Sequence, residues 1–420
     1  MSRMAPTVTT PPQRSETRGG VRVSTEVDGM PLWFEVEPEH ATLLSDRADA
    51  VAVALLLQSM QRGRDLHVGG QATDILLHQL NGDFQRLVMW MHPSFRRIRV
   101  TADETLPAPA PAAGVATGFS GGIDSFAVLA EYALAPDVPA GLKITHLINN
   151  NVGAHAGDGG ELWRVRCEGL SRVLDDLGLP FVKVDSNLDS HFDRMNFQQS
   201  VTPRNAAVAH LLGGGIGRLH YASTFSFRQA AVLDVGDFSV ADPMSLPLLS
   251  TPAMTITSAG AGMSRVEKTL ALIGNPHARY LDVCTDSDTT REVNCSRCWK
   301  CMRAMLTLEI AGHLGEFCPE PFQLEPYAER RSGYIIEVLA SDQPLLSEIV
   351  EFAEEHGWVW GTQARAGATM IRMRNRVRST AWRLARMSGV RRSWWRGSIR
   401  ASLMRRHPTP EHGPAQQPPR

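Results

Sequence analysis

The stretch GVATGFSGGIDSFAVLAEYAL, residues 114–134, predicts a buried strand, a tight loop and a helix in direct succession. The strand is expected over residues 114–119 and the helix over about residues 122–134. Between them, the glycines of SGGIDS allow a tight turn and a close approach of the backbone to a ligand. Because the loop follows a strand and leads into the N-terminus of a helix, it favours a bound anion.

The side chains of this loop suit a polyphosphate that carries Mg²⁺. Ser120 and Ser125 offer hydroxyl donors, and the carboxylate of Asp124 is a suitable Mg²⁺ ligand. The Gly-Lys-Ser/Thr sequence of a Walker A loop is absent, which argues against GTPases and kinases of that type. The alternative is a Gly/Ser turn that binds nothing. The expected nucleotide-binding residues of the loop are Ser120, Gly121, Gly122, Ile123, Asp124 and Ser125.

The chain beyond this loop alternates short apolar runs with helical patterns. Such alternation predicts a parallel sheet covered by helices on both faces, and the expected fold class is therefore α/β. Further strands are predicted at residues 144–149, 181–185 and 219–223, and further helices at residues 161–177 and 204–212.

The flanking segments predict additional domains. Apolar and polar residues alternate around Asp28-Gly29, which indicates a β-hairpin over residues 21–37. With a helix over residues 48–61 and a strand over residues 95–101, residues 21–105 predict a small N-terminal α+β accessory domain. We expect a disordered leader over residues 1–20, a Pro/Ala linker over residues 106–114 and a C-terminal α/β extension over residues 315–362.

Four of the six cysteines fall within an 18-residue window. A C-x2-C spacing places two sulfurs on one metal, and zinc prefers four thiolates in a tetrahedral arrangement. With no open position, such a site is structural. The alternatives are buried free thiols, an iron–sulfur cluster or a redox disulfide. The expected Zn²⁺ ligands are Cys284, Cys295, Cys298 and Cys301.

A second polar motif is TPRN, residues 202–205, where a proline precedes a predicted helix. Arg204 at the start of this helix is placed to reach a phosphate, with a solvated arginine as the alternative.

With SGGxDS intact, the chain resembles the PP-loop, or N-type, ATP-pyrophosphatase superfamily. Its members cleave ATP between the α- and β-phosphates and leave a substrate oxygen adenylated. The order SGGxDS, P-x-R-N and C-x2-C-x2-C with an upstream cysteine is similar to the 7-cyano-7-deazaguanine synthase branch over about residues 115–314. Members of that branch adenylate a carboxylate, form an amide with ammonia, and adenylate again to form a nitrile.

The resemblance implies a parallel-sheet PP-loop domain, of the adenine nucleotide alpha-hydrolase type, with ATP, Mg²⁺ and a structural Zn²⁺. SRVEKT, residues 264–269, lies where the family has a helix start with Lys and Glu, so its cations would neutralise leaving pyrophosphate; exposed charges at a helix start are the alternative. The branch's aromatic-Pro-Asp-Cys-Arg substrate segment is not recognisable in residues 221–237, so we expect a different acceptor. The implied catalytic residues are Asp124, Arg204 and Lys268, and the implied nucleotide contacts outside the loop are Arg204, Asn205 and Arg265.

The function expected on these grounds is ATP-dependent adenylation of a substrate carboxylate, followed by capture with an amine. One alternative is an enzyme that adenylates a tRNA base or another nucleobase, and another is a non-catalytic ATP-sensing module. A thiolating enzyme would need a catalytic cysteine. Cys167 lies in a predicted helix without a C-x-x-C partner, which argues against that chemistry.

The net charge of −1 hides a strong asymmetry. Residues 363–420 contain 14 Arg, no Lys and one acid, a charge of +13, so the remainder carries −14. Arginines alternate with an apolar face and Trp394-Trp395 follows, which is typical of segments that bind RNA or an anionic membrane surface. A tail that aids solubility is the alternative, and residues 407–420 are expected to be disordered. The apolar face is formed by Met370, Met373, Val377, Ala381 and Leu384.

The sequence predicts a cytoplasmic location. No apolar run approaches the ~18 residues that a membrane span requires, and the N-terminus lacks the apolar core of a signal peptide. The crowded cysteines differ from a secreted disulfide framework. We also expect the chain to form a homo-oligomer.

Overall fold

The computed structural model describes residues 4–154, 160–192, 194–285, 288 and 294–387, with the backbone alone from residue 377 onward. The chain divides into two compact units, Met1–Val359 and Trp360–Arg420. The first unit contains both sheets and all of the predicted site residues.

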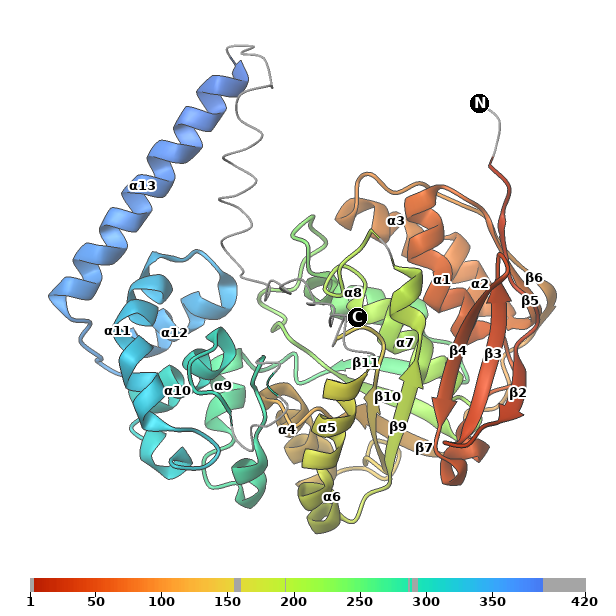
Figure 1. The fold of residues 1–420 in the computed structure, drawn as a ribbon, viewed down its shortest axis with the longest axis horizontal. Helices are drawn as coiled ribbons and strands as arrows, with labels where there is room; N and C mark the ends of the chain where they lie inside the picture. Colours follow the sequence, from red (N-terminus) through yellow and green to blue (C-terminus); the bar gives the residue numbers. More distant parts are fainter. Residues whose placement is uncertain (1–3, 155–159, 193, 286–287, 289–293, 388–420) are drawn as a thin grey trace, which may run out of the picture. The chain divides into compact units, whose positions relative to one another are not determined.

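An eight-stranded mixed sheet forms the centre of the first unit (Figure 1). Its order is β11-β10-β7-β8-β9-β4-β3-β2, and the five strands from β11 to β9 are parallel to one another. This parallel part confirms the predicted α/β class. The strands are β2 (Gln13–Glu16), β3 (Val21–Val27), β4 (Met30–Val36), β7 (Gly114–Gly118), β8 (His146–Asn150), β9 (Phe181–Ser186), β10 (Ile216–Ala222) and β11 (Thr255–Ala259).

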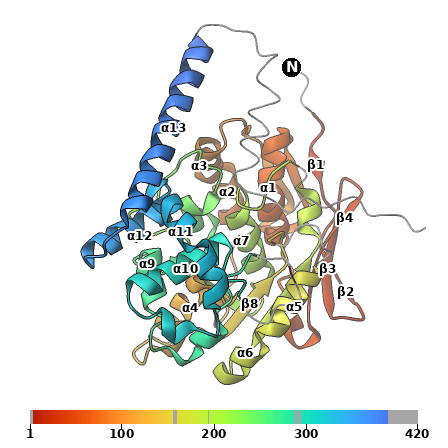
Figure 2. The same ribbon diagram turned by 60° about the vertical axis from the view of Figure 1, so that its left-hand side comes forward.

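Helices connect the parallel strands. Between β9 and β10 the chain reverses its direction across the sheet, so right-handed crossovers place α4 to α6 on one face and α7 on the other. The predicted helix at 161–177 is divided at Leu170. Helix α9 packs against both α4 and α10 (Figures 1 and 2). The helices are α4 (Ile123–Leu129), continued by a π-helical turn (Ala130–Leu134), α5 (Glu161–Gly169), α6 (Ser171–Leu177), α7 (Val201–Leu211), α8 (Asp242–Ser245), α9 (Arg265–Leu270) and α10 (Trp299–Ile310).

The N-terminal hairpin extends the main sheet. Asp28 and Gly29, both at positive φ, form the predicted turn between β3 and β4. β4 then pairs antiparallel with β9, with Phe34 opposite Ser186. This corrects the expectation of a separate accessory domain over residues 21–105, because the edge of the parallel sheet supplies hydrogen-bond partners for the hairpin.

The expected disordered leader also needs correction. Within residues 4–20, β2 pairs with β3, and β1 (Thr7–Val8) pairs with β5 (Leu66–Thr73). Every side chain of β2 is exposed, so its sequence carries no apolar pattern, and backbone pairing alone makes it a strand. β1, β5 and β6 (Val100–Leu106) form a second, parallel sheet; the strand predicted at 95–101 lies instead at 100–106.

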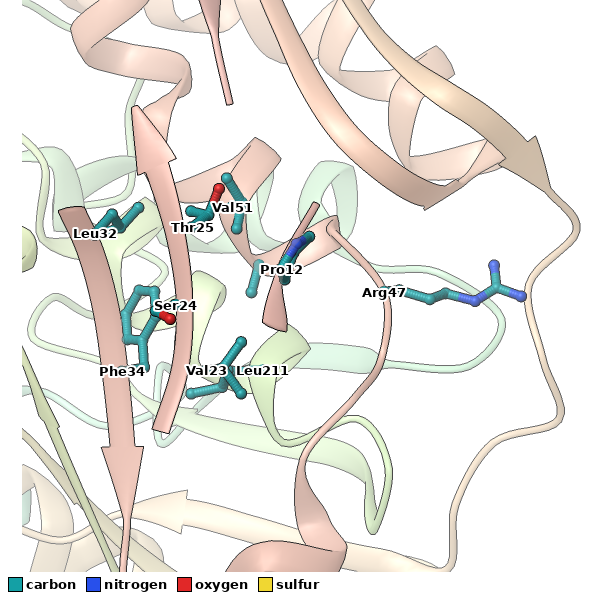
Figure 3. A pocket seen from close by; sticks show the side chains of 10 residues that line it. Pro12, Val23, Ser24, Thr25, Leu32, Phe34, Arg47, Val51 and Leu211 are labelled. Atoms are coloured by element: carbon teal, nitrogen blue, oxygen red, sulfur yellow. The ribbon is translucent and has the colours of Figure 1, made fainter. Parts of the chain in front are cut away.

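Helix α1 (Asp49–Arg62) confirms the prediction for residues 48–61 and is buried from Asp49 to Met60. It packs against α7 and β5. Figure 3 shows that side chains of the hairpin (Val23 and Phe34), of α1 (Val51) and of α7 (Leu211) line one small void. The void there is only about 10 Å³, which is too small for any ligand. Two helices that the sequence did not indicate follow β5, α2 (Asp74–Asn81) and α3 (Asp83–Met91).

The chain after the parallel sheet is helical. Residues 315–362, all of which the structure describes, contain α11 (Leu324–Ala340) and α12 (Pro344–Glu355) but no strand, which corrects the expected α/β extension. Their apolar residues recur at helical rather than alternating spacing. Residues 107–112 have no helix or strand, as their composition predicts, but they do not separate compact units.

The second unit contains α13 (Thr362–Met387), in which Met370 and Met373 are exposed. The remainder of the Arg-rich tail, with Trp394-Trp395 and residues 407–420, lies outside the described residues. In the part of the chain that is described, no helix has both the length and the apolar content needed to cross a membrane.

The packing of the N-terminal hairpin against α1 and α7 can be tested with Phe34→Ala. Phe34 is 2% exposed, so its truncation should destabilise the first unit by about 3–5 kcal/mol in urea denaturation. Met30→Ala on the same strand is the matched control, because Met30 is 53% exposed and its loss should cost less than about 0.5 kcal/mol. Equal losses in the two variants would show that the hairpin does not pack as described.

Candidate functional site

The SGGIDS loop connects β7 to α4. Gly121 has a φ of 73°, and a Cβ there would lie 2.8 Å from Cδ2 of Leu170, so both conformation and space require glycine. The N–H of Asp282 donates to the carbonyl of Gly121 at 2.8 Å and thereby helps to fix the backbone of the loop. The N–H groups of Ser120, Gly121 and Gly122 make no hydrogen bond to the residues that the structure describes, which leaves them able to bind an anion.

The side chains of the loop divide between the ligand side and the core. Ser120 is exposed and lines a pocket. Ser125 also lines this pocket but is buried, and its hydroxyl donates to the carbonyl of Gly122 at 2.8 Å, which stabilises the start of α4. The side chain of Ile123 is buried in the core, so only its backbone can contact a ligand.

Asp124 forms ion pairs with two cations of α9. Oδ2 of Asp124 lies 2.6 Å from Nη2 of Arg265, and Oδ1 lies 3.3 Å from Nζ of Lys268. The side chains of Arg265 and Lys268 are both buried. The structure therefore brings Asp124 together with two predicted residues that lie more than 140 positions later in the sequence.

The two cations are fixed independently of Asp124. Nζ of Lys268 also donates to the carbonyl and hydroxyl of Ser223, at 2.6 and 2.9 Å. Burial lowers the pKa of Lys268, and the charge of Asp124 opposes this shift. The backbone N–H of Arg265 donates to Glu348 of α12 at 2.8 Å, and a capping box of Ser264 and Glu267 fixes the start of α9.

A pocket of about 290 Å³ opens beside the loop at the carboxyl ends of β7, β8 and β10. The crevice between β7 and β10 is where the strand order reverses, the position at which open α/β sheets bind ligands. Asn149 at its wall donates to the carbonyl of Phe119 at 2.8 Å and accepts from the indole of Trp163 at 2.8 Å. The pocket is lined by Ser120, Asp124, Asn150, Asn205, Val208 and Leu219, among others.

Of the two polar residues of the TPRN motif, Asn205 borders the pocket, whereas Arg204 lies inside the fold. Asn205 lines the pocket and accepts a hydrogen bond from Asn150 at 3.0 Å. Arg204 is fully buried, 2.6 Å from Asp189 and 2.6 Å from the carbonyl of Val152. The expectation that Arg204 reaches a phosphate is therefore corrected.

The environment of Arg204 is that of a structural residue. Its guanidinium stacks on the ring of Phe192 at 3.8 Å, and its Nε donates to the hydroxyl of Ser200 at 2.8 Å. Burial lowers the pKa of Arg204, and the hydrogen bond to Asp189 opposes this shift. The side chain supports the loop that follows β8 rather than presenting its charge to the pocket.

The four clustered cysteines converge on one point, where all of their sulfurs lie within 4.8 Å of one another. Sγ of Cys301 is 3.4 Å from that of Cys298 and 4.0 Å from that of Cys295. A tetrahedral site with Zn–S bonds of about 2.3 Å requires sulfurs about 3.8 Å apart. Cys284, Cys295, Cys298 and Cys301 thus form a site that could hold a metal ion such as zinc.

Residues that the sequence did not indicate support the cysteine site. Asn294 donates to the carbonyls of Leu281 and Pro321, at 2.7 and 3.1 Å, and ties the segments around the thiols together. Backbone N–H groups point at the sulfurs, as that of Cys298 does at Sγ of Cys295. Arg166 lines the pocket and donates to the carbonyl of Cys284 at 3.0 Å, so it connects the two sites. Neither an asparagine nor a helical arginine carries a sequence signal for such a role.

Comparison of the chain with protein-family models, curated proteins and solved structures gave no match. The functional proposal below therefore rests on the motif residues and on the geometry just described.

We expect Cys284→Ser to abolish stoichiometric metal binding. Loss of one of four ligands should also reduce the stability of the first unit by about 3 kcal/mol or more, because metal binding and folding are coupled. Metal analysis of the purified protein and thermal unfolding measure the two effects. Cys318→Ser is the matched control, since Cys318 lies outside the cluster. Unchanged metal content in Cys284→Ser would contradict the assignment of this ligand.

Proposed function

We propose that this chain is a PP-loop ATP-pyrophosphatase that adenylates a substrate carboxylate and transfers the acyl group to an amine. The observation that carries the proposal is the pair of buried cations, Arg265 and Lys268, on the carboxylate of Asp124. They lie directly beside a glycine loop with free N–H groups. Developing negative charge on a leaving pyrophosphate is stabilised by fixed donors and cations of this kind.

The strand order supports a nucleotide at this position. Counted from β7, the five parallel strands have the order 3-2-1-4-5, the order found at the start of doubly wound dinucleotide-binding sheets. Ligands of such sheets lie outside the carboxyl ends of the strands, where the order reverses. The SGGIDS loop and the pocket both occupy that edge.

Asp124 suits the Mg²⁺ that accompanies ATP. Its carboxylate borders the pocket, with one oxygen directed to each cation. When phosphates bind, Arg265 and Lys268 can pair with them, which releases the carboxylate oxygens for the metal ion. Mg²⁺ would then neutralise charge on the phosphate oxygens as the bond to the α-phosphate breaks.

The pocket suits the nucleoside part of ATP. Its volume of about 290 Å³ is at the lower end of small-molecule sites. Val208 and Leu219 offer an apolar surface for a base, and the side chains of Asn149, Asn150 and Asn205 offer directional donors and acceptors. Arg204 takes no part in this proposal, because Asp189 already binds it.

The cysteine cluster is proposed to hold a structural Zn²⁺. Four thiolates leave no position for water or substrate, so the ion would hold the start of α10 rather than take part in chemistry. Cys298 is the N-cap of α10 and Cys301 lies in its first turn. The metal would therefore fix the direction of this helix.

A nucleobase of an RNA is the second candidate acceptor, favoured by the exposed Arg372, Arg374 and Arg376 of α13. Sulfur transfer to such a base would need a reactive thiol. Burial raises the pKa of Cys167 to about 12, so its thiolate is scarce near neutral pH. A carboxylate acceptor that reacts with an amine needs no protein nucleophile, and we therefore place it first.

Asp124→Ala should reduce ATP–pyrophosphate isotope exchange by about 100-fold or more, because it removes the Mg²⁺ ligand and the partner of both cations. The assay is run with fractions of a cytosolic extract as the source of acceptor. Asp137→Ala, an exposed acid beyond α4, is the control and should exchange at the wild-type rate.

Each outcome of this assay has a distinct meaning. Exchange supported by a small-molecule fraction would establish carboxylate adenylation, whereas exchange only with the RNA fraction would favour the second candidate. Wild-type exchange in Asp124→Ala would exclude the proposed site. ATP binding without exchange in any fraction would indicate a nucleotide-sensing module.

A further inference from the structure

A buried arginine with two unpartnered nitrogens lies on α10, the helix that packs against α9, and its guanidinium carbon is 5.2 Å from the ring centroid of Trp299. Arg303 of α10 is 5% exposed, and its Nε and Nη1 have no partner in the described structure. A guanidinium is always charged and carries five donors. Burying it without partners costs free energy, and native structures rarely retain such a group unless something else binds it.

Cations lie near Arg303 as well as carboxylates. Its charge interacts most strongly with Arg265, and also with Asp124 and Glu348. Lys300 precedes it by three positions on the same face of α10 and interacts with Arg303, Arg265 and Asp124. Within the described part of the chain, the groups whose charges interact here include two carboxylates, Asp124 and Glu348, and five cations, which are Arg166, Arg265, Lys268, Lys300 and Arg303.

The position of α10 is fixed by two other parts of the molecule. It packs against α9, which supplies Arg265 and Lys268, and two of the clustered cysteines lie at its start, Cys298 as the N-cap and Cys301 in the first turn. The cations of the two helices are therefore held near one another before any ligand binds. The contact between α9 and α10 therefore keeps more cations than carboxylates in this part of the fold.

We propose that Arg303 and Lys300 bind the β- and γ-phosphates of ATP, and the pyrophosphate released from them, next to Arg265. This inference rests on the proposed function. A polyphosphate fits the excess of cations better than a carboxylate, which would bring a single negative charge. The planar guanidinium of Arg303 also suits bidentate hydrogen bonds to phosphate oxygens.

The test is binding of inorganic pyrophosphate with Mg²⁺, measured by titration calorimetry. Arg303→Met should weaken this binding roughly 10- to 100-fold, because charge-assisted hydrogen bonds are lost. The affinity for AMP should stay unchanged, since no residue of α10 lines the pocket proposed for the nucleoside. Arg279→Gln removes an exposed arginine paired with Asp176 and controls for the loss of one positive charge.

Thermal unfolding provides a second readout that a purely structural role would not give. Without ligand, Arg303→Met should melt at or above the wild-type temperature, because an unpaired buried charge is replaced by an apolar side chain. At the same concentration, added pyrophosphate should raise the melting temperature of the wild type more than that of Arg303→Met. Arg303→Lys should recover part of the shift, and metal content should be equal in all variants.

The results separate this inference from the proposed function. Equal pyrophosphate affinity in wild type and Arg303→Met would overturn the role of Arg303 and leave the adenylation reaction standing. No pyrophosphate binding by the wild type would also overturn it. Pyrophosphate binding that depends on Arg303, in a protein without ATP–pyrophosphate exchange, would support the anion site and reject the proposed reaction.

Discussion

The ion pairs of Asp124 with Arg265 and Lys268 are the interaction on which the site depends. Asp124 belongs to the first turn of α4, directly after the central strand β7, whereas both cations belong to α9, after the last strand. Charges brought this close in a poorly solvated place attract each other strongly, but burial of Lys268 also has a cost, which its hydrogen bonds to Ser223 offset. The ion pairs therefore hold α9, which follows the last strand of the sheet, against the SGGIDS loop, which follows β7.

The N-terminal residues complete the body that carries this site. Their hairpin covers the free edge of β9, which would otherwise expose unpaired backbone groups. Helix α1 packs against α7, whose second turn supplies Asn205 to the pocket. The region expected to be an accessory domain thus shares a core with the proposed nucleotide-binding sheet, and α7 belongs both to that core and to the wall of the pocket.

Local patterns predicted much of the parallel sheet, and long-range contacts explain what they missed. The run from residue 114 to 134 carries its own periodicity and glycines, so β7, the loop and α4 follow from it. β2 has only exposed side chains and is a strand because β3 offers hydrogen bonds, which no local pattern can show. In the site, the cysteine spacing indicated one metal site because sulfur ligands are close in sequence. Asn294 and Arg166 were missed because each acts through backbone carbonyls of distant segments.

Two buried arginines show why a motif does not by itself determine a role. Arg204 belongs to the P-x-R-N motif, yet Asp189, Val152 and Ser200 already bind its Nε and Nη1, and Nη2 alone has no partner in the described structure. Its charge is neutralised within the fold, so an incoming phosphate would have to break an existing ion pair. Arg303 belongs to no motif, but its Nε and Nη1 are unpartnered, and its strongest charged neighbour is another cation. An anion that reaches Arg303 gains hydrogen bonds and relieves repulsion without breaking a pair. The ion pair of Arg204 with Asp189 is therefore consistent with a structural role, and the unpartnered guanidinium of Arg303 is the basis for proposing that it binds a ligand.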